Sequence, residues 1–597
     1  MSIKKSTLSA FAAVVGTSLV LSACGGSNGD GGNGSTDGTT DIKSMATAKG
    51  QSGDEYTSPD VEQGTQEIKV STDNPFTAYN NAAADANNSY NSFALTMVLS
   101  GAYKLDGNDN VLLNKDVMES VELTNKDPQV VTWNIKPGVT WSDGEAWDCD
   151  DFHLAWLSQT GKVKEGDADI FTAAGTTGYD VLEKLECPTP TQVVTTFSET
   201  FPDYKSLFGI SLDILPAHIL EQETGIADIT KLTPTSDIAE LKKVADFWKT
   251  KWNGFDAKLM PSSAQYKITA FEQNNSVTLE RNEKFAGKPG GPAKIVLRGI
   301  ADQVAQAQAL ENGELVVNSM AQPDANAAER LRNLSAQGVT FGATAGLTFE
   351  HFDLNVENKW LKDQAVRKAF MQCVNRDELV EKLVRPVLED AQPKGSLIFF
   401  QGEDGYTDNY AQYTGDANAA KATLEGAGYT IGPDGFATKN GEKVSLKIAH
   451  TDIPRRKQTV ELVQSHCKPA GIEIIDDTDP NFLDTRVSQG DYDIALFAWS
   501  SAPFKSGQKS IYSTGGGQNW SNWSNKEVDA ALADATTNLD EAAATAAYAK
   551  ADAILAEENY SLPLFPLPRM WAFKGVDKVF FQSYYGTLWN ANEWVVS

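Results

Sequence analysis

Residues 132–156 read TWNIKPGVTWSDGEAWDCDDFHLAW, and the rest of the chain is best understood from this stretch outward. Apolar and polar residues alternate from Val131 to Ile135, which is the period-two pattern of a strand with one buried face. Pro137-Gly138 then predicts a turn, and a second short alternation follows it. Asp148, Asp150 and Asp151 offer N-cap oxygens to a helix beginning near Phe152. The predicted order of strand, turn, strand, turn and helix is typical of an α/β protein, and we assign Trp133, Trp141 and Trp156 to its core.

The length of the chain predicts more than one lobe. At 597 residues it exceeds what a single hydrophobic core normally serves. We expect a first lobe at 65–345, with a subdomain at about 95–205, and a second lobe at 346–560. Strands alternate with helices in the second lobe, which predicts a sheet with parallel members. The aromatic-rich tail 561–597 is expected to return to the first lobe.

The amino-terminal residues resemble an export signal. Lys4 and Lys5 precede an apolar run from Leu8 to Leu21, which is long enough for a signal-peptide core and too short to span a bilayer. The run ends in Leu21-Ser22-Ala23-Cys24, which is similar to a bacterial lipobox. This similarity implies a signal peptide at 1–23, a lipid on Cys24 as the membrane anchor, and a location on the outer face of the cytoplasmic membrane. A plain secretory signal is the alternative.

Composition after Cys24 predicts a tether and an acidic globular body. Residues 24–64 are rich in Gly, Ser, Thr, Asn and Asp, so we expect a flexible linker. Removal of Lys4 and Lys5 leaves 49 basic and 80 acidic residues, a formal charge of −31. Such a charge argues against nucleic acid as a partner.

Four further cysteines fit an oxidising compartment and allow three pairings. We favour Cys149 with Cys187 and Cys373 with Cys467, because each bridge then stays inside one predicted lobe. Four buried free thiols are the alternative.

Signals for catalysis or for a cofactor are weak. None of the five histidines has a metal-ligand spacing such as HExxH, so we expect no metal and no cofactor. Ser506 and Lys509 fit the S-x-x-K motif of penicillin-interactive serine enzymes, but neither S-D-N nor K-T-G follows. A serine hydrolase is therefore a remote alternative, and we expect no enzymatic activity.

The opening stretch also carries a family resemblance. From Trp133 to Phe152 it resembles the signature of the peptide/nickel class of ABC-transporter solute-binding proteins, which includes oligopeptide- and dipeptide-binding proteins. Further segments agree in the same order: Ile214 to Leu220, Tyr266 to Ile268, Leu279 to Asn282, Val366 to Ala369, Asn375 to Asp377, Ala427 to Tyr429, Gly471-Ile472 and Gly490 to Ile494 leading to Trp499. The resemblance implies a two-lobed α/β fold, like the type II periplasmic binding proteins. It also implies a monomer that closes by a hinge and hands its solute to an ABC permease with ATPase subunits.

The expected ligand is a peptide, although the chain departs from the peptide-binding pattern. Those relatives hold the ligand amine with an Asp shortly after the tryptophan matching Trp499, where this chain has Ser500-Ser501-Ala502. Leu496 stands where an oligopeptide binder carries Arg, whereas Arg486 does match an Arg of the pattern and is a candidate carboxylate anchor. A glycoside, a metal chelate or a lipid headgroup is therefore the alternative ligand.

The resemblance and the local composition together select the candidate ligand-binding residues. Several have a structural alternative: turn capping for the serines, a surface ion pair for Arg486, a tie at the hinge for Asn355, and core packing for Trp520 and Trp523. We favour core packing only for Trp523, the neighbour of Trp520 in a Gly-rich loop. The candidates are Trp499, Ser500, Ser501, Arg486, Phe349, Asn355, Trp520, Asn88 and Tyr90, with Asn87 beside the last two.

Overall fold

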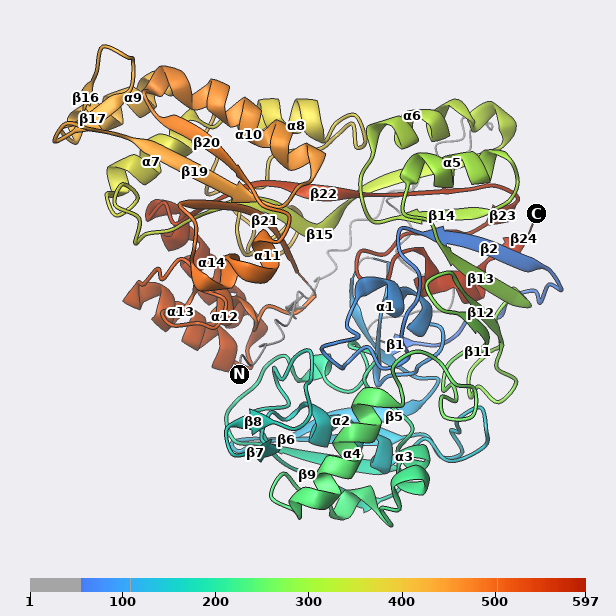
Figure 1. Ribbon diagram of the computed structural model, residues 1–597. Helices are drawn as coiled ribbons and strands as arrows, with labels where there is room; N and C mark the ends of the chain where they lie inside the picture. Colours follow the sequence, from blue (N-terminus) through green and yellow to red (C-terminus); the bar gives the residue numbers. More distant parts are fainter. Residues whose placement is uncertain (1–54, 108, 502, 597) are drawn as a thin grey trace, which may run out of the picture. The chain divides into compact units, whose positions relative to one another are not determined.

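A computed structural model describes residues 55–107, 109–501 and 503–596, which form two compact units. Lobe I comprises residues 55–344 and 569–596, and lobe II comprises residues 345–568. The chain leaves lobe I within β15 (Thr340–Leu354) and returns within β22 (Ser561–Phe573) (Figure 1). The sequence predicts these crossings after residue 345 and after residue 560. The predicted signal peptide and Cys24 lie outside the described residues.

Lobe I is built on a mixed sheet. Its strands run in the order β11-β12-β13-β2-β14-β22, with β13 and β14 parallel to β2. Fully buried Ile68, Val70 and Leu279 belong to its apolar core. The bounds are β2 (Glu67–Thr72), β11 (Tyr266–Glu272), β12 (Ser276–Arg281), β13 (Lys294–Gly299), β14 (Val317–Met320), α1 (Ser89–Leu95), α5 (Gln303–Glu311) and α6 (Ala325–Asn333).

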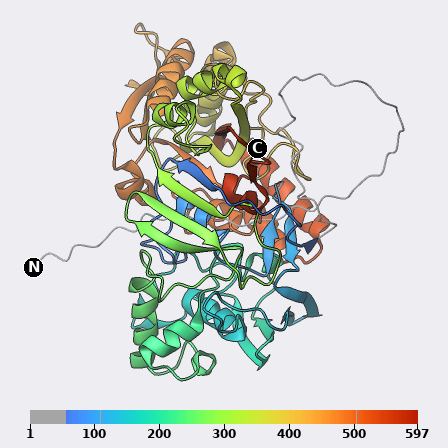
Figure 2. The ribbon, with the colours of Figure 1, turned by 90° about the vertical axis from the view of Figure 1, so that its right-hand side faces the viewer.

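A subdomain of lobe I contains residues 132–156. Its antiparallel sheet has the order β5-β6-β10-β9, and the Cα partner of Trp133 is Val193. Figures 1 and 2 show this sheet and its helices at one end of lobe I, away from β11 to β13. The bounds are β5 (Met118–Lys126), β6 (Gln129–Ile135), β9 (Leu182–Thr189), β10 (Gln192–Phe197), α2 (Cys149–Gln159), α3 (Ala217–Thr224) and α4 (Ile238–Thr250).

The local predictions for this subdomain are largely confirmed. Trp133, Trp141 and Trp156 are at most 3% exposed, and Asp148 caps α2 in a capping box with Asp151. The disulfide Cys149–Cys187 joins the first turn of α2 to β9 as expected. The predicted second strand is wrong, because Thr140 makes only an isolated bridge to Ala146.

The last part of the expected tether is folded. Strand β1 (Glu55–Tyr56) pairs in parallel with β4 (Val111–Asn114), which pairs with β3 (Tyr103–Leu105). The backbone N–H of Ser58 donates to the Asp116 carboxylate, 3.1 Å away, and Tyr56 is buried. The linker prediction is therefore wrong for residues 55–64, because one tyrosine and a buried hydrogen bond suffice to hold this polar segment on lobe I.

Lobe II has a sheet with the order β15-β21-β19-β20, and β19 is parallel to both of its neighbours, as predicted. Helices α8 and α10 lie on one side of this sheet, and α12 to α14 lie on the other (Figure 1). The bounds are β19 (Ser445–His450), β20 (Glu473–Thr478), β21 (Ile494–Ser500), α7 (Gln364–Cys373), α8 (Arg376–Leu383), α9 (Ala417–Gly426), α10 (Pro454–Cys467), α11 (Phe482–Thr485), α12 (Gln508–Tyr512), α13 (Lys526–Thr537) and α14 (Glu541–Glu557).

The second predicted disulfide, Cys373–Cys467, joins the carboxyl ends of α7 and α10 inside lobe II. Within the described ranges of both lobes, no helix is long and apolar enough to cross a bilayer.

Candidate functional site

A cluster of rings covers one face of the lobe II sheet, and we call it the aromatic wall. It consists of Phe349 and His351 on β15, Phe497 and Trp499 on β21, and Trp520 from the Gly-rich loop. The antiparallel ladder pairs Phe349 with Trp499 and His351 with Phe497. Because residues two apart in a strand point to the same face, these four side chains share one side of the sheet.

The rings of the wall are in direct contact. Trp499 and Trp520 have centroids 5.2 Å apart with planes 30° apart, and Phe497 meets Trp499 edge-on at 5.0 Å. These are the offset and T-shaped arrangements that aromatic quadrupoles favour. Trp499 is 7% exposed, whereas Trp520 is half-buried. Trp520 is therefore the member of the wall that presents the most ring surface to a ligand.

His351 is a buried, uncharged member of the wall. Its side chain is fully buried, and neither ring nitrogen has a hydrogen-bond partner among the described residues. Burial lowers the pKa of His351 to about 3, although the neighbouring Glu350 acts in the opposite direction. The imidazole is therefore neutral at physiological pH, and it stacks 6.0 Å from Trp499.

Glu350 lies between the two wall residues of β15 in sequence and points to the opposite face of the sheet. Arg455 and Arg456 of α10 contact its carboxylate at 3.0 and 2.9 Å. Burial alone would raise the pKa of Glu350, but the two guanidinium groups outweigh it and lower the pKa to about 2. This carboxylate is already neutralised, so it is not a free anchor for a ligand amine.

Ser500 and Ser501 end the strand beneath the wall. The hydroxyl oxygens of Ser500 and Thr348 lie 3.0 Å apart across the ladder, and the backbone N–H of Ser501 donates to Leu347 at 2.8 Å. These contacts attach the end of β21 to β15. They fit the structural alternative for the serines, in which they cap the turn at the strand end. Ala502, which replaces the expected acidic anchor, lies outside the described residues.

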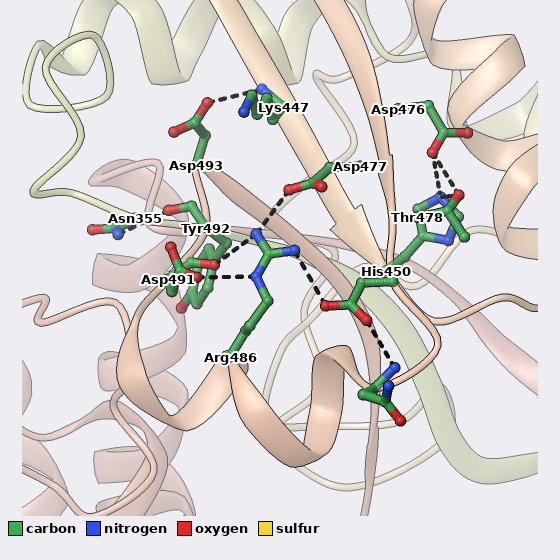
Figure 3. A network of polar contacts seen from close by, with 12 residues as sticks. Asn355, Lys447, His450, Asp476, Asp477, Thr478, Arg486, Asp491, Tyr492 and Asp493 are labelled. Atoms are coloured by element: carbon green, nitrogen blue, oxygen red, sulfur yellow. Dashed lines mark hydrogen bonds and ion pairs between the residues drawn. The ribbon is translucent and has the colours of Figure 1, made fainter.

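Arg486 is engaged by carboxylates of its own chain. Its guanidinium contacts Asp477 at 2.8 Å, Asp491 at 3.1 Å and Asp479 at 3.5 Å (Figure 3). The hydrogen bond that Arg486 donates to Asp477 is the largest of the effects that raise the pKa of Arg486. The expected role of Arg486 as a carboxylate anchor is replaced by this ion-pair network, which ties β20 and α11 to the turn before β21.

Asn355 is also a tie within lobe II. Its side-chain amide donates to the carbonyl oxygens of Gly490 and Tyr492, both at 2.9 Å, and its side-chain oxygen accepts from the backbone of Glu357. The amide therefore holds the end of β15 against the approach to β21, as the structural alternative foresaw. Figure 3 shows Asn355 and Arg486 beside the segment with Asp491, Tyr492 and Asp493, which precedes β21. Trp499 lies near the other end of that strand.

The candidates in lobe I have structural partners. The Asn88 side chain caps α1 by accepting from the backbones of Tyr90 and Asn91 at 3.0 Å, and Asn87 donates to the Asn81 carbonyl. The Tyr90 hydroxyl lies 3.5 Å from Asp73, and burial raises the pKa of Tyr90 to about 12. Asn88 is thus a helix cap, and Tyr90 is half-buried, so its role in ligand binding stays a prediction.

Sequence reasoning missed two residues packed behind the wall. Lys394 and Phe400 belong to the irregular segment between α8 and α9, and the Phe400 ring meets Phe349 edge-on at 6.0 Å. The Lys394 ammonium lies over both rings. No motif marks this lysine in the sequence. Trp523, by contrast, is buried against Tyr560 and packs in the core as expected.

The sequence model named bacterial extracellular solute-binding proteins, family 5 Middle, matches residues 113–522, which span the subdomain and most of lobe II. The chain belongs to this family. Its opening stretch, the wall and the Arg486 network all lie inside the matched range, so these are features of a family 5 solute-binding protein.

Relatives of this family 5 protein include the oligopeptide-binding protein OppA of Mycobacterium bovis. It is 24% identical over 496 residues, covering 81% of this chain and 77% of the relative. An uncharacterized lipoprotein of Mycobacterium leprae is 24% identical over 534 residues, covering 85% of this chain and 88% of the relative.

Solved structures agree with the fold of the family 5 protein. The periplasmic EDTA-binding protein EppA has a TM-score of 0.79 and 24% identity, covering 92% of this chain and all of its own. The oligopeptide-binding protein AppA of Bacillus subtilis, in complex with a nonapeptide, has a TM-score of 0.68 and 20% identity, covering 90% of this chain and all of its own. The expected two-lobed α/β fold is thereby confirmed. In the part of the chain that the structure describes, no group of three His, Cys, Asp or Glu side chains is arranged to hold a metal.

Proposed function

We propose that this family 5 protein captures peptides on the aromatic wall of lobe II and delivers them to the permease of an ABC importer. The observation that carries the proposal is the half-buried Trp520 stacked on Trp499 at the end of β21. Buried tryptophans with one accessible face are common anchors in binding sites. The oligopeptide-binding relative supports a peptide as the solute.

The charges around the wall define which part of a peptide it accepts. Glu350 is neutralised by Arg455 and Arg456, and the acids nearest Arg486 are held by that arginine. A buried ammonium without a carboxylate is costly, so the amino terminus of the peptide does not lie on this wall. We infer that the wall packs an uncharged stretch of peptide.

The location of the protein follows from its amino-terminal motif. A lipid on Cys24 would hold the folded body at the outer face of the membrane, and the lipoprotein relative supports this anchor. Of the predicted tether, residues 55–64 pack on lobe I, and the rest lies outside the described residues. We propose a monomer that meets the permease and its ATPase subunits through the folded body, without a cofactor.

A non-peptide solute is the second candidate, and the similarity to an EDTA-binding protein favours it. A planar or chelated ligand would stack on Trp520 as well as a peptide side chain would. A serine hydrolase has less support, because the family is one of solute-binding proteins. We propose no hydrolytic role for Ser506, and the absence of covalent labelling by a serine-reactive β-lactam tests this.

The proposal is tested by calorimetric titration with a matched panel: the pentapeptide Ala-Ala-Phe-Ala-Ala, a mixed pentapeptide library, Fe(III)-EDTA and a simple glycoside. We expect heat from peptides only, and Trp499→Ala should weaken that binding about tenfold or more, because a buried ring at a binding site typically contributes more than about 1.4 kcal/mol. Binding of the chelate without binding of any peptide would replace the proposal with the second candidate. A Trp499→Ala isotherm equal to wild type would remove the wall from the site.

A further inference from the structure

Lys394 is a buried lysine. Among the described residues, no carboxylate forms a salt bridge with its ammonium. It is 3% exposed and lies in the irregular segment between α8 and α9. Its backbone N–H donates to the Leu564 carbonyl at 3.0 Å, and its ammonium donates to the Phe399 carbonyl. The first hydrogen bond holds the main chain of Lys394, and the second holds the end of its side chain.

The remaining contacts of the Lys394 ammonium are aromatic. Its nitrogen lies 3.8 Å from the centroid of Phe400 and 4.6 Å from the centroid of Phe349. A cation within about 6 Å of a ring face is attracted by the quadrupole of the ring, and more strongly when it is desolvated. Phe349 is the ladder partner of Trp499. The charge of Lys394 is therefore connected to the aromatic wall through one ring.

Four charged groups lie around this lysine. The buried Arg376 guanidinium of α8 donates to the Lys394 carbonyl at 2.7 Å. The Lys505 ammonium binds the Glu403 carboxylate at 2.7 Å and lies over the Phe399 ring. Asp552 of α14 is 1% exposed and accepts from the backbone of Leu397 at 2.9 Å and from the Asn409 amide at 2.7 Å. Both carboxylates are thus committed to other partners and act on Lys394 from a distance.

The ionisation of Lys394 falls in an accessible range. Burial lowers the pKa of its ammonium to about 7, and Lys505 adds to the effect, while Glu403 and Asp552 oppose it. Lys394 thus contacts one ring of the aromatic wall and one ring beside it, and it can change its charge near neutral pH.

We propose that Lys394 is a positioning residue of the aromatic wall: its protonated form holds Phe349 and Phe400 in place, and solute affinity falls when the proton is lost. The proposal rests on the proposed function, in that the wall is the surface that receives the solute. Neutral lysine keeps its hydrogen bond to Phe399 but loses the attraction to both rings. By linkage, a solute that prefers the protonated form also tightens the binding of that proton.

The proposal predicts that solute affinity falls as the pH rises and Lys394 loses its proton. We expect the dissociation constant of Ala-Ala-Phe-Ala-Ala to rise about threefold or more between pH 6 and pH 8 in wild type, since one cation–π contact is worth that much or more. Lys394→Arg stays charged at both values, so it should bind tightly with no pH dependence. Lys394→Met should bind weakly with no pH dependence. Lys368→Met, an exposed lysine of α7, is the matched control and should retain the wild-type slope.

Each outcome separates this proposal from the proposed function. No binding of peptide at any pH would contradict the proposed function. Tight binding with the same dissociation constant at pH 6 and pH 8, or a slope that persists in Lys394→Arg, would overturn the role of Lys394. A ¹³C-lysine NMR titration of the ligand-free protein covers the case in which Lys394→Met does not fold or no solute binds. One resonance should titrate near pH 7 and be absent from Lys394→Arg, and the lack of such a resonance would also overturn the role.

Discussion

Trp520 stacks on Trp499 with ring centroids 5.2 Å apart and planes 30° apart. Trp499 is fixed by its strand and its ladder partner Phe349, whereas Trp520 comes from a Gly-rich loop. The stack therefore joins a rigid ring to a ring on an irregular segment. Such a pair presents a flat apolar surface without a charge of its own.

Removal of the outer ring should weaken binding without unfolding lobe II. Because Trp520 is half-buried, we expect Trp520→Ala to lower peptide affinity about tenfold, while the melting temperature changes little. Trp520→Phe keeps an aromatic face and should recover most of the loss. Calorimetric titration of both variants measures this, and equal affinity in Trp520→Ala and wild type would show that the stack does not contact the solute.

Arg486 should matter for stability and not for binding. Its aspartate partners lie on β20, directly after β20 and in the turn before β21, whereas Trp499 lies near the carboxyl end of β21. Arg486→Met leaves three carboxylates without their cation, so we expect a loss of about 1–3 kcal/mol of stability, seen as a lower melting temperature. Peptide affinity should stay within about twofold of wild type. A large loss of affinity at unchanged melting temperature would restore the ligand-anchor role.

Glu350 should be a major determinant of lobe II stability. Substitution by Gln leaves Arg455 and Arg456 buried without a countercharge, which typically costs about 3–5 kcal/mol. Glu442→Gln, in an exposed pair with Lys359, is the control and should cost less than about 1 kcal/mol. Since the pKa of Glu350 is lowered to about 2, its contribution is present above its ordinary pKa and is lost only as the pH falls toward 2. Similar melting temperatures for the two variants at pH 7 would contradict this ranking.

Asp353 should give the stability a dependence of the opposite sign. Burial raises its pKa to about 7, against hydrogen bonds from Tyr560 and Tyr492. The folded state thus retains a proton that the unfolded chain releases near pH 4, and stability falls between about pH 4 and pH 7 by up to about 1.4 kcal/mol per unit. Asp353→Asn removes this contribution. The difference in melting temperature between variant and wild type should therefore shift in favour of the variant from pH 5 to pH 7.5; a constant difference would exclude the effect.

Much of the fold follows from short-range signals in the sequence. Alternation around Trp133 and the caps near Asp148 place a strand and a helix correctly, because each depends on neighbouring residues alone. The disulfides follow from keeping each bridge inside one lobe. The folded segment at Tyr56 could not be foreseen, since its composition is that of a linker and its partner β4 lies more than fifty residues away.

Some of the predicted candidate residues lie together in the structure. Trp499, Phe349 and Trp520 come together because ladder register and ring stacking join them. Arg486 matches the family pattern, and Asn355 flanks the strand that opens lobe II. Their polar groups are nevertheless satisfied by Asp477 and by the Gly490 carbonyl, which no single-sequence pattern reveals. Lys394 escaped notice because no motif marks it and because the ring that connects it to the wall, Phe349, is distant in sequence. Long-range contacts of this kind are what local sequence reasoning cannot supply.

Native mass spectrometry of the protein purified without added ligand tests the central claim most directly. A protein that captures peptides is expected to carry a ladder of co-purified peptide masses, which Trp499→Ala should deplete while Arg486→Met retains it. A single discrete non-peptide mass on the wild-type protein, with no peptide ladder, would contradict the account.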